Sequence, residues 1–587
     1  MRGRHRNPGL GRSARIAVVV LVLGLVAGGG AFGALRYLSS GCSDQTRLTV
    51  GAAPEIVPAL QHAADRWAAG ASANRQCVSV SVVAAAPVDV ALALANSSGV
   101  RMTGLSPLGT PSPDGSPPPA PPTPAAAPTF DVWVPDSSTW LSRVRTAAPS
   151  LVPADARSIA TSPVVLAMPE KTAQGLGWWP DHMPTWSTLL GLLTSGAHLN
   201  VGIVAPSRDA AGLSSLIALD SAAESLGVTG SEAKVAVSLA LHDDEVPAES
   251  DLLSKFPGST DDAAMAAGLT AAPLAEHSLI AYDAQSPAVR LAALYVDPAP
   301  EALDYPYAVM PTATGERARL ATQLRDSLTG DDYVADLGSA GLRGADGLAR
   351  FPALPGSPAT ITTKPLDGTV VADVLTTWVS LARPSRMLAV MDVSGSMSTP
   401  VPTAAGKTRA EVAIDAARRG LGLFPDSWSV GLWTFSTNLD GNKDYLQLLP
   451  IRPMPEQRPN LEHALQTIKP IPQGDTGLYD TVLAAYQTVQ QGWDPASVNS
   501  VVLLTDGQND DANGITLNQL ISSLKAVMDP RYPVQVIIVA IGDQVSLPDL
   551  NKITNTTGGH TFPASDPSQI DKIFLDALLV RPDTPAA

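Results

Sequence analysis

The sequence predicts an α/β protein in which an N-terminal transmembrane helix precedes two folded domains. Three observations support this prediction. The chain has 587 residues, more than a single hydrophobic core usually organises. A long uncharged stretch lies near the N-terminus, and from Arg47 onward short apolar runs alternate with amphipathic segments. Alternating strands and helices are typical of α/β folds with largely parallel sheets.

The first element is a candidate membrane anchor at residues 16–35. These twenty residues carry no charge, and as a helix they span about 30 Å, the thickness of a hydrocarbon core. Residues 1–15 are basic, which predicts that they stay in the cytoplasm and that the bulk of the chain is extracytoplasmic. We therefore expect a single-pass protein of the cell membrane. A cleaved signal peptide is the alternative, although its apolar region is usually shorter, ~7–15 residues.

The two cysteines of the chain, Cys42 and Cys77, both follow the predicted anchor. An even number of cysteines in an oxidising compartment favours a disulfide between them. Lipidation of Cys42 is an alternative, but a lipobox needs an aliphatic residue three positions earlier, where Ser39 stands. Two unrelated buried thiols are a further alternative.

The first folded domain is expected to span residues 47–349. It begins with strands and helices in alternation: strands at 48–50, 77–83 and 130–134, and helices ending near Ala69 and at 88–95. Residues 106–128 contain ten prolines and almost no large apolar side chains. Such a segment cannot form a core, so it is expected to be an exposed, extended insertion.

The same alternation continues to the end of this domain. Further strands are expected at 162–169, 201–204, 279–282, 291–295 and 307–310. Helices are expected at 186–193, from 211 onward, and at 231–241, 263–269 and 316–328. A passage rich in glycine and proline, residues 338–367, separates this domain from the next.

The second domain, residues 384–579, shows a cleaner pattern. Its strands are expected at 387–391, 430–435, 445–449, 500–505 and 534–541, with 445–449 as an edge strand. Its helices are expected at 408–423, 478–489, from 516 onward and at 570–578. Thr408 with Glu411, and Thr516 with Gln519, have the spacing of capping boxes. The pattern predicts a doubly wound sheet.

Polar residues follow two strands of this domain and precede one of its helices. Asp392, Ser394 and Ser396 follow the first strand, Thr476 precedes the helix at 478, and Asp506 follows a central strand. Ligands of open parallel sheets bind at the carboxyl ends of strands. Two carboxylates and three hydroxyls are hard oxygen donors of the kind that Mg²⁺ prefers. Residues 509–514 imitate an EF-hand loop, but Leu520 replaces its bidentate glutamate, which indicates a polar loop.

This constellation resembles the metal-ion-dependent adhesion site of von Willebrand factor A (VWA) domains and integrin I domains. The resemblance implies that Asp392, Ser394, Ser396, Thr476 and Asp506 bind Mg²⁺ or Mn²⁺. It also implies that an acidic side chain of a protein or peptide ligand completes the coordination of the metal.

The first domain resembles the type II periplasmic solute-binding proteins, which have two lobes with a cleft between them. The resemblance rests on residues 49–54 (TVGAAP), residues 131–138 (DVWVPDSS), and Pro206-Ser207 before Ala211-Gly212. By analogy a small solute would bind between the lobes, where backbone N–H groups at helix starts hold an anion. The cleft residues that this analogy implies are Ala53, Ser137, Ser138 and Ser207. The whole chain resembles actinobacterial membrane-anchored proteins described as substrate-binding and VWA domain-containing.

The net charge of −16 and the lack of a basic cluster after Arg15 argue against a nucleic-acid ligand. The sequence contains no HExxH, P-loop or GxSxG motif, so we expect a protein that is not an enzyme. The leading hypothesis is an extracytoplasmic binding and interaction protein. A solute-capturing component of a transport or sensing system is the alternative, and a metal-dependent enzyme of the cell envelope is the third.

Overall fold

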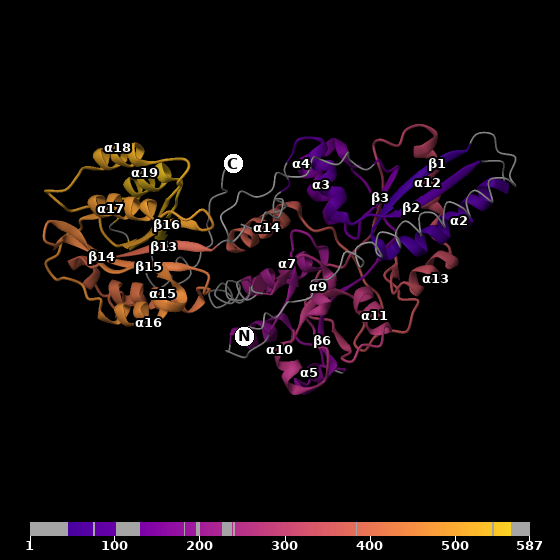
Figure 1. Ribbon diagram of the computed structural model, residues 1–587, viewed down its shortest axis with the longest axis horizontal. Helices are drawn as coiled ribbons and strands as arrows, with labels where there is room; N and C mark the ends of the chain where they lie inside the picture. Colours follow the sequence, from indigo (N-terminus) through magenta and orange to yellow (C-terminus); the bar gives the residue numbers. More distant parts are fainter. Residues whose placement is uncertain are drawn as a thin grey trace, which may run out of the picture.

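The computed structural model describes residues 45–73, 77–100, 102, 129–180, 182–194, 200–225, 238, 241–242, 244–382, 384–542 and 545–564. The predicted cytoplasmic segment, anchor, Cys42, proline-rich insertion and last helix lie outside these residues. Within them, no helix is both long and apolar enough to cross a membrane. Figure 1 shows two folded parts along the longest axis, with residues up to 382 in one and residues 384–564 in the other.

The first part consists of two lobes, and the first lobe is built on a five-stranded sheet. The strand order is β2 (Val78–Ala84), β1 (Thr46–Ala52), β3 (Val132–Val134), β11 (Pro306–Val309) and β4 (Arg157–Ser158). β1 pairs in parallel with β2 and β3, whereas β11 is antiparallel to its neighbours. The helices are η1 (Pro54–Ile56), α2 (Val57–Ala73), α3 (Pro87–Ser97), α4 (Ser138–Ala147), α12 (Glu316–Ser327) and α13 (Asp331–Ser339).

The helices of the first lobe cover both faces of its sheet, and the side chains of the strands alternate between these faces. Val132 and Val134 pack with the core that α2, α12 and α13 complete, whereas Trp133, between them, packs with α3 and α4. Successive strand residues point to opposite faces, so β3 is buried on both. The first lobe is therefore a three-layer α/β unit.

The second lobe contains two small sheets. One has the order β10 (Leu291–Leu294), β6 (Val164–Pro169), β9 (Ala272–Ala275), and the other pairs β7 (Ile203–Val204) with β8 (Glu245–Val246). The three-stranded sheet is antiparallel, so the expectation of a largely parallel sheet is wrong for this lobe. The helices are α5 (Glu170–Gly175), α6 (Trp186–Thr194), α7 (Ala210–Ser225), α9 (Glu249–Ser254), α10 (Asp262–Ala267) and α11 (Glu276–Ala284).

The strand predicted at 279–282 is also wrong, because these residues belong to helix α11. A run of four apolar or aromatic residues is too short to show whether the period is that of a strand or of a helix. The buried residues of α11 are its first four, from Glu276 to Leu279, so the apolar run lies largely past the buried turn.

Two of the chain crossings between the lobes pair with each other. Ile159 donates its backbone N–H to Tyr305, and Ser162 and Leu303 exchange backbone hydrogen bonds at 2.9 Å. Next to the first crossing, β5 (Ala160–Thr161) pairs with β12 (Arg343–Gly344). These paired crossings form the hinge.

A buried ion pair fastens β12 to the second lobe. The side chains of Arg343 and Glu276 both have an exposed fraction of 0%. Arg343 donates from Nε to Oε2 of Glu276 at 2.8 Å and from Nη2 to Oε1 at 2.7 Å. Tyr295 donates to the same carboxylate, and Arg343 also donates to the carbonyl of Pro358 at 2.9 Å. The charges are thus fully paired within the core.

The passage before the second domain contains a helix that the sequence did not predict, α14 (Gly368–Ala382). Val371, Val374, Leu375 and Trp378 pack into the core of the second lobe, where α14 contacts α7. Its first residue lies against Ser142 of α4 in the first lobe. The helix therefore contacts both lobes, and only residues 383 and 384 separate it from the next strand.

The second part is a doubly wound sheet, as predicted, with a sixth strand, β18, that the sequence did not predict. Its order is β15 (Lys443–Pro453), β14 (Ser429–Asp440), β13 (Ser385–Asp392), β16 (Val498–Thr505), β17 (Gln535–Ile541) and β18 (Thr561–Ala564). All pairs are parallel except that of β15, the expected edge strand. The helices are α15 (Arg409–Leu423), α16 (Met454–Thr467), α17 (Leu478–Gln491), α18 (Leu517–Val527) and α19 (Leu547–Thr557).

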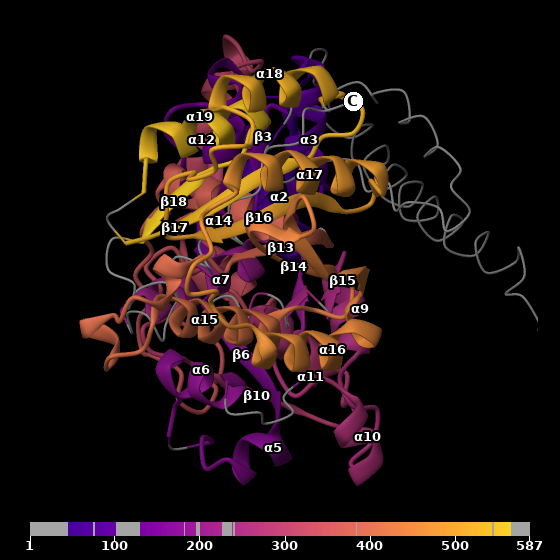
Figure 2. The same cartoon turned by 90° about the vertical axis from the view of Figure 1, so that its left-hand side faces the viewer.

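The five α-helices in the described part of this domain cover both faces of the sheet. α15 and α16 pack on one face and α17, α18 and α19 on the other, as Figure 2 shows. The capping boxes predicted at α15 and α18 are both present, with the side chains of Thr408 and Thr516 accepting from Glu411 N and Gln519 N. Because helices cover both faces, the ends of the strands are the part of the sheet that can be reached by a ligand.

Candidate functional site

The order of the strands reverses at β13 in the second domain. β14 and β15 lie on one side of it, and β16, β17 and β18 lie on the other. In open α/β sheets, a crevice forms outside the carboxyl ends of the strands at such a reversal. Asp392 is the last residue of β13, and Asp506 directly follows β16. The two predicted carboxylate ligands therefore stand at this crevice.

Short hydrogen bonds connect four of the predicted metal ligands. Oδ1 of Asp392 accepts from the backbone N–H of Ser394 at 2.8 Å. The hydroxyls of Ser394 and Ser396 are 3.0 Å apart, and Ser396 donates to Oδ1 of Asp506 at 2.7 Å. Oδ2 of Asp392 accepts from the hydroxyl of Thr505 at 2.6 Å, which fixes the orientation of this carboxylate.

The fifth predicted ligand, Thr476, comes from the loop before α17. Its side chain is buried, and its carbonyl accepts from the N–H of Asp510 at 2.9 Å. A Cβ atom at position 507 would lie 3.1 Å from the Thr476 hydroxyl, so Gly507 leaves room for this threonine beside Asp506. The structure thus brings all five predicted residues to one edge of the sheet.

The two carboxylates are almost completely buried, with exposed fractions of 1% for Asp392 and 0% for Asp506. Burial raises the pKa of Asp392 to about 6, against hydrogen bonds from Ser394 and Thr505 that lower it. The negative charge of Asp392 is therefore under-compensated by the protein. Two buried carboxylates beside three hydroxyl oxygens fit a hard divalent cation such as Mg²⁺.

Arg409 is part of this site, although the sequence did not single it out. Its Nη1 atom donates to Oδ2 of Asp506 at 2.8 Å, so Asp506 presents its other oxygen, Oδ1, to Ser396. Arg409 is the first residue of α15, where the helix dipole disfavours a positive charge. The position of a basic residue at the start of a helix is the local feature that could have drawn attention to Arg409.

A second group of carboxylates lies in the same domain. Asp444, Asp480 and Asp511 each present an oxygen, and these atoms lie within 4.8 Å of one another. Asp511 belongs to the EF-hand-like loop, which therefore contributes an acidic side chain to this cluster. Burial raises the pKa of Asp444, and the charges of Asp511 and Asp480 raise it further. The three carboxylates thus repel one another, and Asp444 lies next to Gly477, which follows the predicted metal ligand Thr476.

Replacing Asp444 by asparagine is expected to raise the Tm of this domain by about 2 °C at pH 8, the shift produced by roughly 0.5–1 kcal/mol. An amide keeps the acceptor for the N–H of Asn438 and removes one of three like charges. Because the pKa of Asp444 is raised in the folded state, its carboxylate begins to destabilise the fold above the unfolded pKa of about 3.9 and does so fully above the folded-state pKa. The gain in Tm should therefore be lost at about pH 3. Thermal unfolding in chelator measures both values. Asp475→Asn, at an exposed position, is the control and should change neither; a Tm gain for Asp444→Asn that is undiminished at about pH 3 would contradict the explanation.

The four predicted cleft residues lie at the starts of elements in the first part, but two of their N–H groups are already used. The N–H of Ala53 donates to the carbonyl of Val134 at 2.8 Å, and that of Ser138 donates to Oδ1 of Asp304 at 2.6 Å. Ser137 caps α4, and the carbonyl of Ser207 accepts from Arg143 of α4 at 2.9 Å. That last bond crosses from one lobe to the other.

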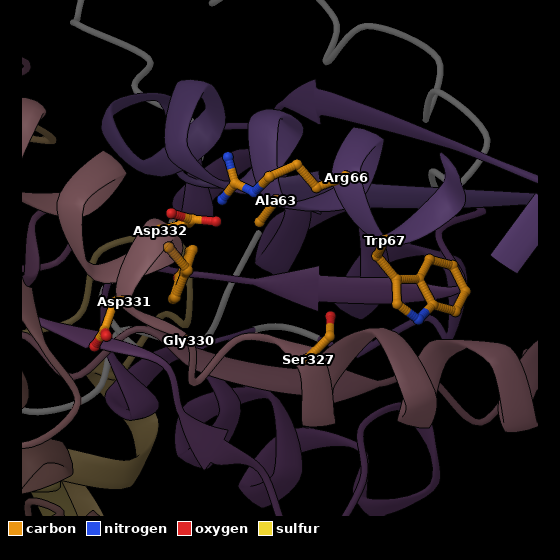
Figure 3. A pocket seen from close by; sticks show the side chains of 8 residues that line it. Ala63, Arg66, Trp67, Ser327, Gly330, Asp331 and Asp332 are labelled. Carbon is orange, nitrogen blue, oxygen red and sulfur yellow. The ribbon is translucent and has the colours of Figure 1, made fainter. Parts of the chain in front are cut away.

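A separate pocket of about 540 Å³ opens on the outer layer of the first lobe. Figure 3 shows that Ala63, Arg66 and Trp67 of α2 face Ser327 and the start of α13 across it. Arg66 is paired with Asp336 at 2.7 Å. None of the predicted cleft residues lines this pocket, so it is distinct from the space between the lobes.

Comparison with protein families assigns both parts. Residues 48–343 match the model of the bacterial extracellular solute-binding proteins, which is half of the chain. The chain belongs to this solute-binding protein family. Residues 387–576 match the model of the von Willebrand factor type A domain. The domain types expected from the sequence are therefore confirmed, and the protein combines a solute-binding domain with a VWA domain.

Relatives of this solute-binding protein include two uncharacterised proteins of Mycobacterium tuberculosis, each 26% identical over 483 residues. That similarity covers 76% of this chain and 67% of each relative. Among solved structures, a putative extracellular solute-binding protein from Bordetella parapertussis is 14% identical with a TM-score of 0.38, over 57% of this chain and 97% of that one. A von Willebrand factor type A protein from Catenulispora acidiphila is 16% identical with a TM-score of 0.28, over 34% and 42%.

Proposed function

We propose that the protein is a membrane-anchored extracytoplasmic binding protein whose VWA domain holds a protein ligand through Mg²⁺ or Mn²⁺, while the solute-binding domain takes a small solute between its lobes. Both domain families are binding types, which supports an extracellular binding protein. The observation that carries the proposal is the meeting of Asp392, Ser394, Ser396, Thr476 and Asp506 at the strand-order reversal.

The residues of this edge have distinct roles in the proposal. Asp392 and Asp506 would supply the negative charge that holds the cation, of which Arg409 offsets one unit, and the three hydroxyls would add neutral oxygens. When bound, the cation offers an electrophilic position to a carboxylate of the protein ligand. Arg409 holds the second oxygen of Asp506 and thereby orients the first, while Thr505 orients Asp392. The acidic net charge disfavours nonspecific capture of anions, so the site itself selects the ligand.

Capture of partners from membranes by the full chain, with Mg²⁺ and with EDTA, tests this function. We expect an identified protein partner to be retained in Mg²⁺ or Mn²⁺ and lost in EDTA. Replacing single acidic residues of the purified partner by their amides should then find one that is required. Binding to that partner that survives both EDTA and Asp392→Ala would contradict the mechanism.

The anchor and the cell-membrane location remain part of the proposal, supported by the charge pattern of residues 1–35. We expect mass spectrometry of the native protein to find a peptide preceding Ile16 still attached to the chain. Quantitative release of a form that starts near Leu35 would instead identify a cleaved signal peptide.

We also propose that Cys42 and Cys77 form a disulfide. The carbonyl of Cys77 accepts from the N–H of Thr46 at 2.9 Å, which places Cys77 beside the start of β1, four residues after Cys42. A loop of this length should stabilise the fold by roughly 3–4 kcal/mol in the chain-entropy model. Non-reducing peptide mapping should recover the linked pair, and two free thiols or a lipid on Cys42 would rule it out.

A further inference from the structure

The pocket on the outer layer of the first lobe lies between helices that are distant in sequence. Ala63, Arg66 and Trp67 of α2 form one wall. The opposite wall consists of Ser327, the last residue of α12, and residues 330–333 at the start of α13. The volume of about 540 Å³ lies within the range of small-molecule sites, roughly 300–1,000 Å³. The pocket can therefore hold a small organic molecule.

The two walls are fastened to each other beside the pocket. Ala63 of α2 and Tyr333 of α13 belong to the same buried cluster, so the walls rest on a common core. Arg66 donates from Nη2 to Oδ2 of Asp336 at 2.7 Å, and Nδ1 of His62 lies 3.4 Å from the other oxygen of this carboxylate. The pocket is thus built by packed helices and not by a loop.

Charged groups of both signs line the pocket. Arg66 brings a guanidinium, and Asp331 and Asp332 bring exposed carboxylates. With Asp336, the partner of Arg66, these groups sum to −2, but Asp331 and Asp332 stand in the first turn of α13, where the helix dipole adds about half a positive charge. An anion would meet two carboxylates, and a cation would meet the guanidinium. Neither kind of simple ion matches both walls.

Trp67 gives the pocket an aromatic surface. Figure 3 shows its indole at one end of the pocket, with the guanidinium of Arg66 and the carboxylate of Asp332 at the other end. Trp67 is only partly buried, although it packs against the core of the first lobe. One end of the pocket therefore offers a flat apolar ring, and the other end offers charged donors and acceptors.

Tyr333 provides an observation that does not depend on these charges. It lines the pocket, its exposed fraction is 2%, and its hydroxyl is buried without a hydrogen-bond partner among the described residues. A buried hydroxyl without a partner costs free energy. A hydrogen-bonding group that enters the pocket beside Tyr333 would remove this cost.

We propose that this pocket binds a saccharide, one ring of which lies against the indole of Trp67. The hydroxyls of the sugar accept from Arg66, donate to Asp332 and pair with the hydroxyl of Tyr333. A neutral sugar fits both walls because each of its hydroxyls can donate and accept, and its apolar C–H face packs on an aromatic ring. The site lies outside the space between the lobes, so the proposal goes beyond the proposed function and does not rest on it.

Saturation-transfer difference NMR and isothermal titration calorimetry on the full chain test the proposal, in a detergent that has no sugar head group. Maltose, lactose, mannobiose and N,N′-diacetylchitobiose are the saccharides, and tetramethylammonium chloride and sodium sulfate represent simple ions. We expect at least one saccharide to bind and neither salt to give a signal that depends on the pocket. Failure of all four saccharides to bind would overturn the proposal, as would a simple ion that binds in the pocket when no saccharide does.

A variant that fills the pocket localises the binding. Gly330 lines the pocket with a φ of −80°, and a Cβ atom there would meet nothing within 4 Å. Gly330→Leu therefore adds a side chain in open space at the pocket without backbone strain, and it should weaken saccharide binding at least tenfold. Gly258→Leu is the matched control, because a Cβ atom at this position of the second lobe also meets nothing within 4 Å. Equal affinity in the two variants would overturn the proposal.

Two smaller changes test the hydrogen bonds to the sugar. Tyr333→Phe should weaken binding about two- to tenfold but should not lower the Tm, because the hydroxyl that it removes has no partner among the described residues. Asp332→Asn should weaken binding about tenfold, since it removes a charged acceptor. Asp155→Asn is the control, because Asp155 is exposed and does not line the pocket. If both Tyr333→Phe and Asp332→Asn bound the saccharide as tightly as the control, the proposal would be wrong.

The metal site of the other domain provides a further comparison. Asp392→Ala should leave saccharide binding unchanged, and Gly330→Leu should leave Mn²⁺ binding unchanged. Loss of saccharide binding in Asp392→Ala would contradict a site confined to the first lobe. Failure of this proposal would leave the metal-dependent capture of a protein ligand untouched.

Discussion

Replacing Arg343 by methionine is expected to destabilise the solute-binding domain by about 3–5 kcal/mol, the largest effect that we predict for a single substitution. Arg343 and Glu276 are completely buried and joined by two hydrogen bonds, and Arg343 also donates to the Pro358 carbonyl. Without the guanidinium, Glu276 would be a buried charge whose remaining donors are neutral. Hydrogen–deuterium exchange in the native chain measures the loss in the peptides around β12 and α11, and peptides of the VWA domain serve as an internal reference.

Two further variants show whether the loss of stability in Arg343→Met comes from the unpaired charge or from the change of side chain itself. Arg350→Met makes the same change in an exposed arginine paired with Asp346, where a loss of about 0–1 kcal/mol is expected. The double variant Glu276→Leu/Arg343→Met removes both charges and should recover much of the stability lost by Arg343→Met alone. If Arg343→Met cost no more than Arg350→Met, the ion pair would not be the element that fastens β12 to the second lobe.

Replacing Asp392 by alanine is expected to lower the affinity for Mg²⁺ and Mn²⁺ by about a hundredfold or more. Removal of a residue that merely orients a metal ligand typically costs 10–100-fold, and a charged ligand should contribute at least as much. The fold should persist, because Asp392 is the last residue of β13 and its partners are polar. Titration calorimetry with MnCl₂ on the full chain measures the affinity, and circular dichroism checks the fold.

Asp426→Ala is the matched control, since it removes an exposed carboxylate of the same domain. Its Mn²⁺ affinity should equal that of the unmodified chain. Arg409→Gln provides a second comparison: the Asp506 carboxylate loses its charged partner but keeps its place, so binding should change much less than in Asp392→Ala. Undiminished Mn²⁺ binding by Asp392→Ala would show that this edge of the sheet is not the metal site.

The parts of the fold that the sequence predicted well are those with a local signal. Thr408 with Glu411 and Thr516 with Gln519 form their capping boxes within four residues, so no distant contact decides them. Helix α14 also carried a local signal, because Val371, Val374, Leu375 and Trp378 recur at helical spacing. The sequence analysis assigned no element to these residues, which follow the passage rich in glycine and proline at 338–367. Only packing against α7 shows that it is part of the first domain.

The candidate sites divide in the same way. Asp392, Ser394 and Ser396 lie within five consecutive residues at the end of β13, and the apolar pattern of that strand predicted where they would be. Arg409 reaches Asp506 across 97 positions of sequence, and no short motif records such a contact.

Helix α14 joins the two domains through a very short connection. It lies on α4 of one lobe and α7 of the other, and only residues 383 and 384 separate its last turn from β13, the strand that carries Asp392 at its far end. From the last residue of α14 to the first residue of β13 there are three Cα–Cα steps, which span at most about 11 Å. The start of the strand that carries Asp392 therefore lies within that distance of a helix that belongs to the solute-binding domain.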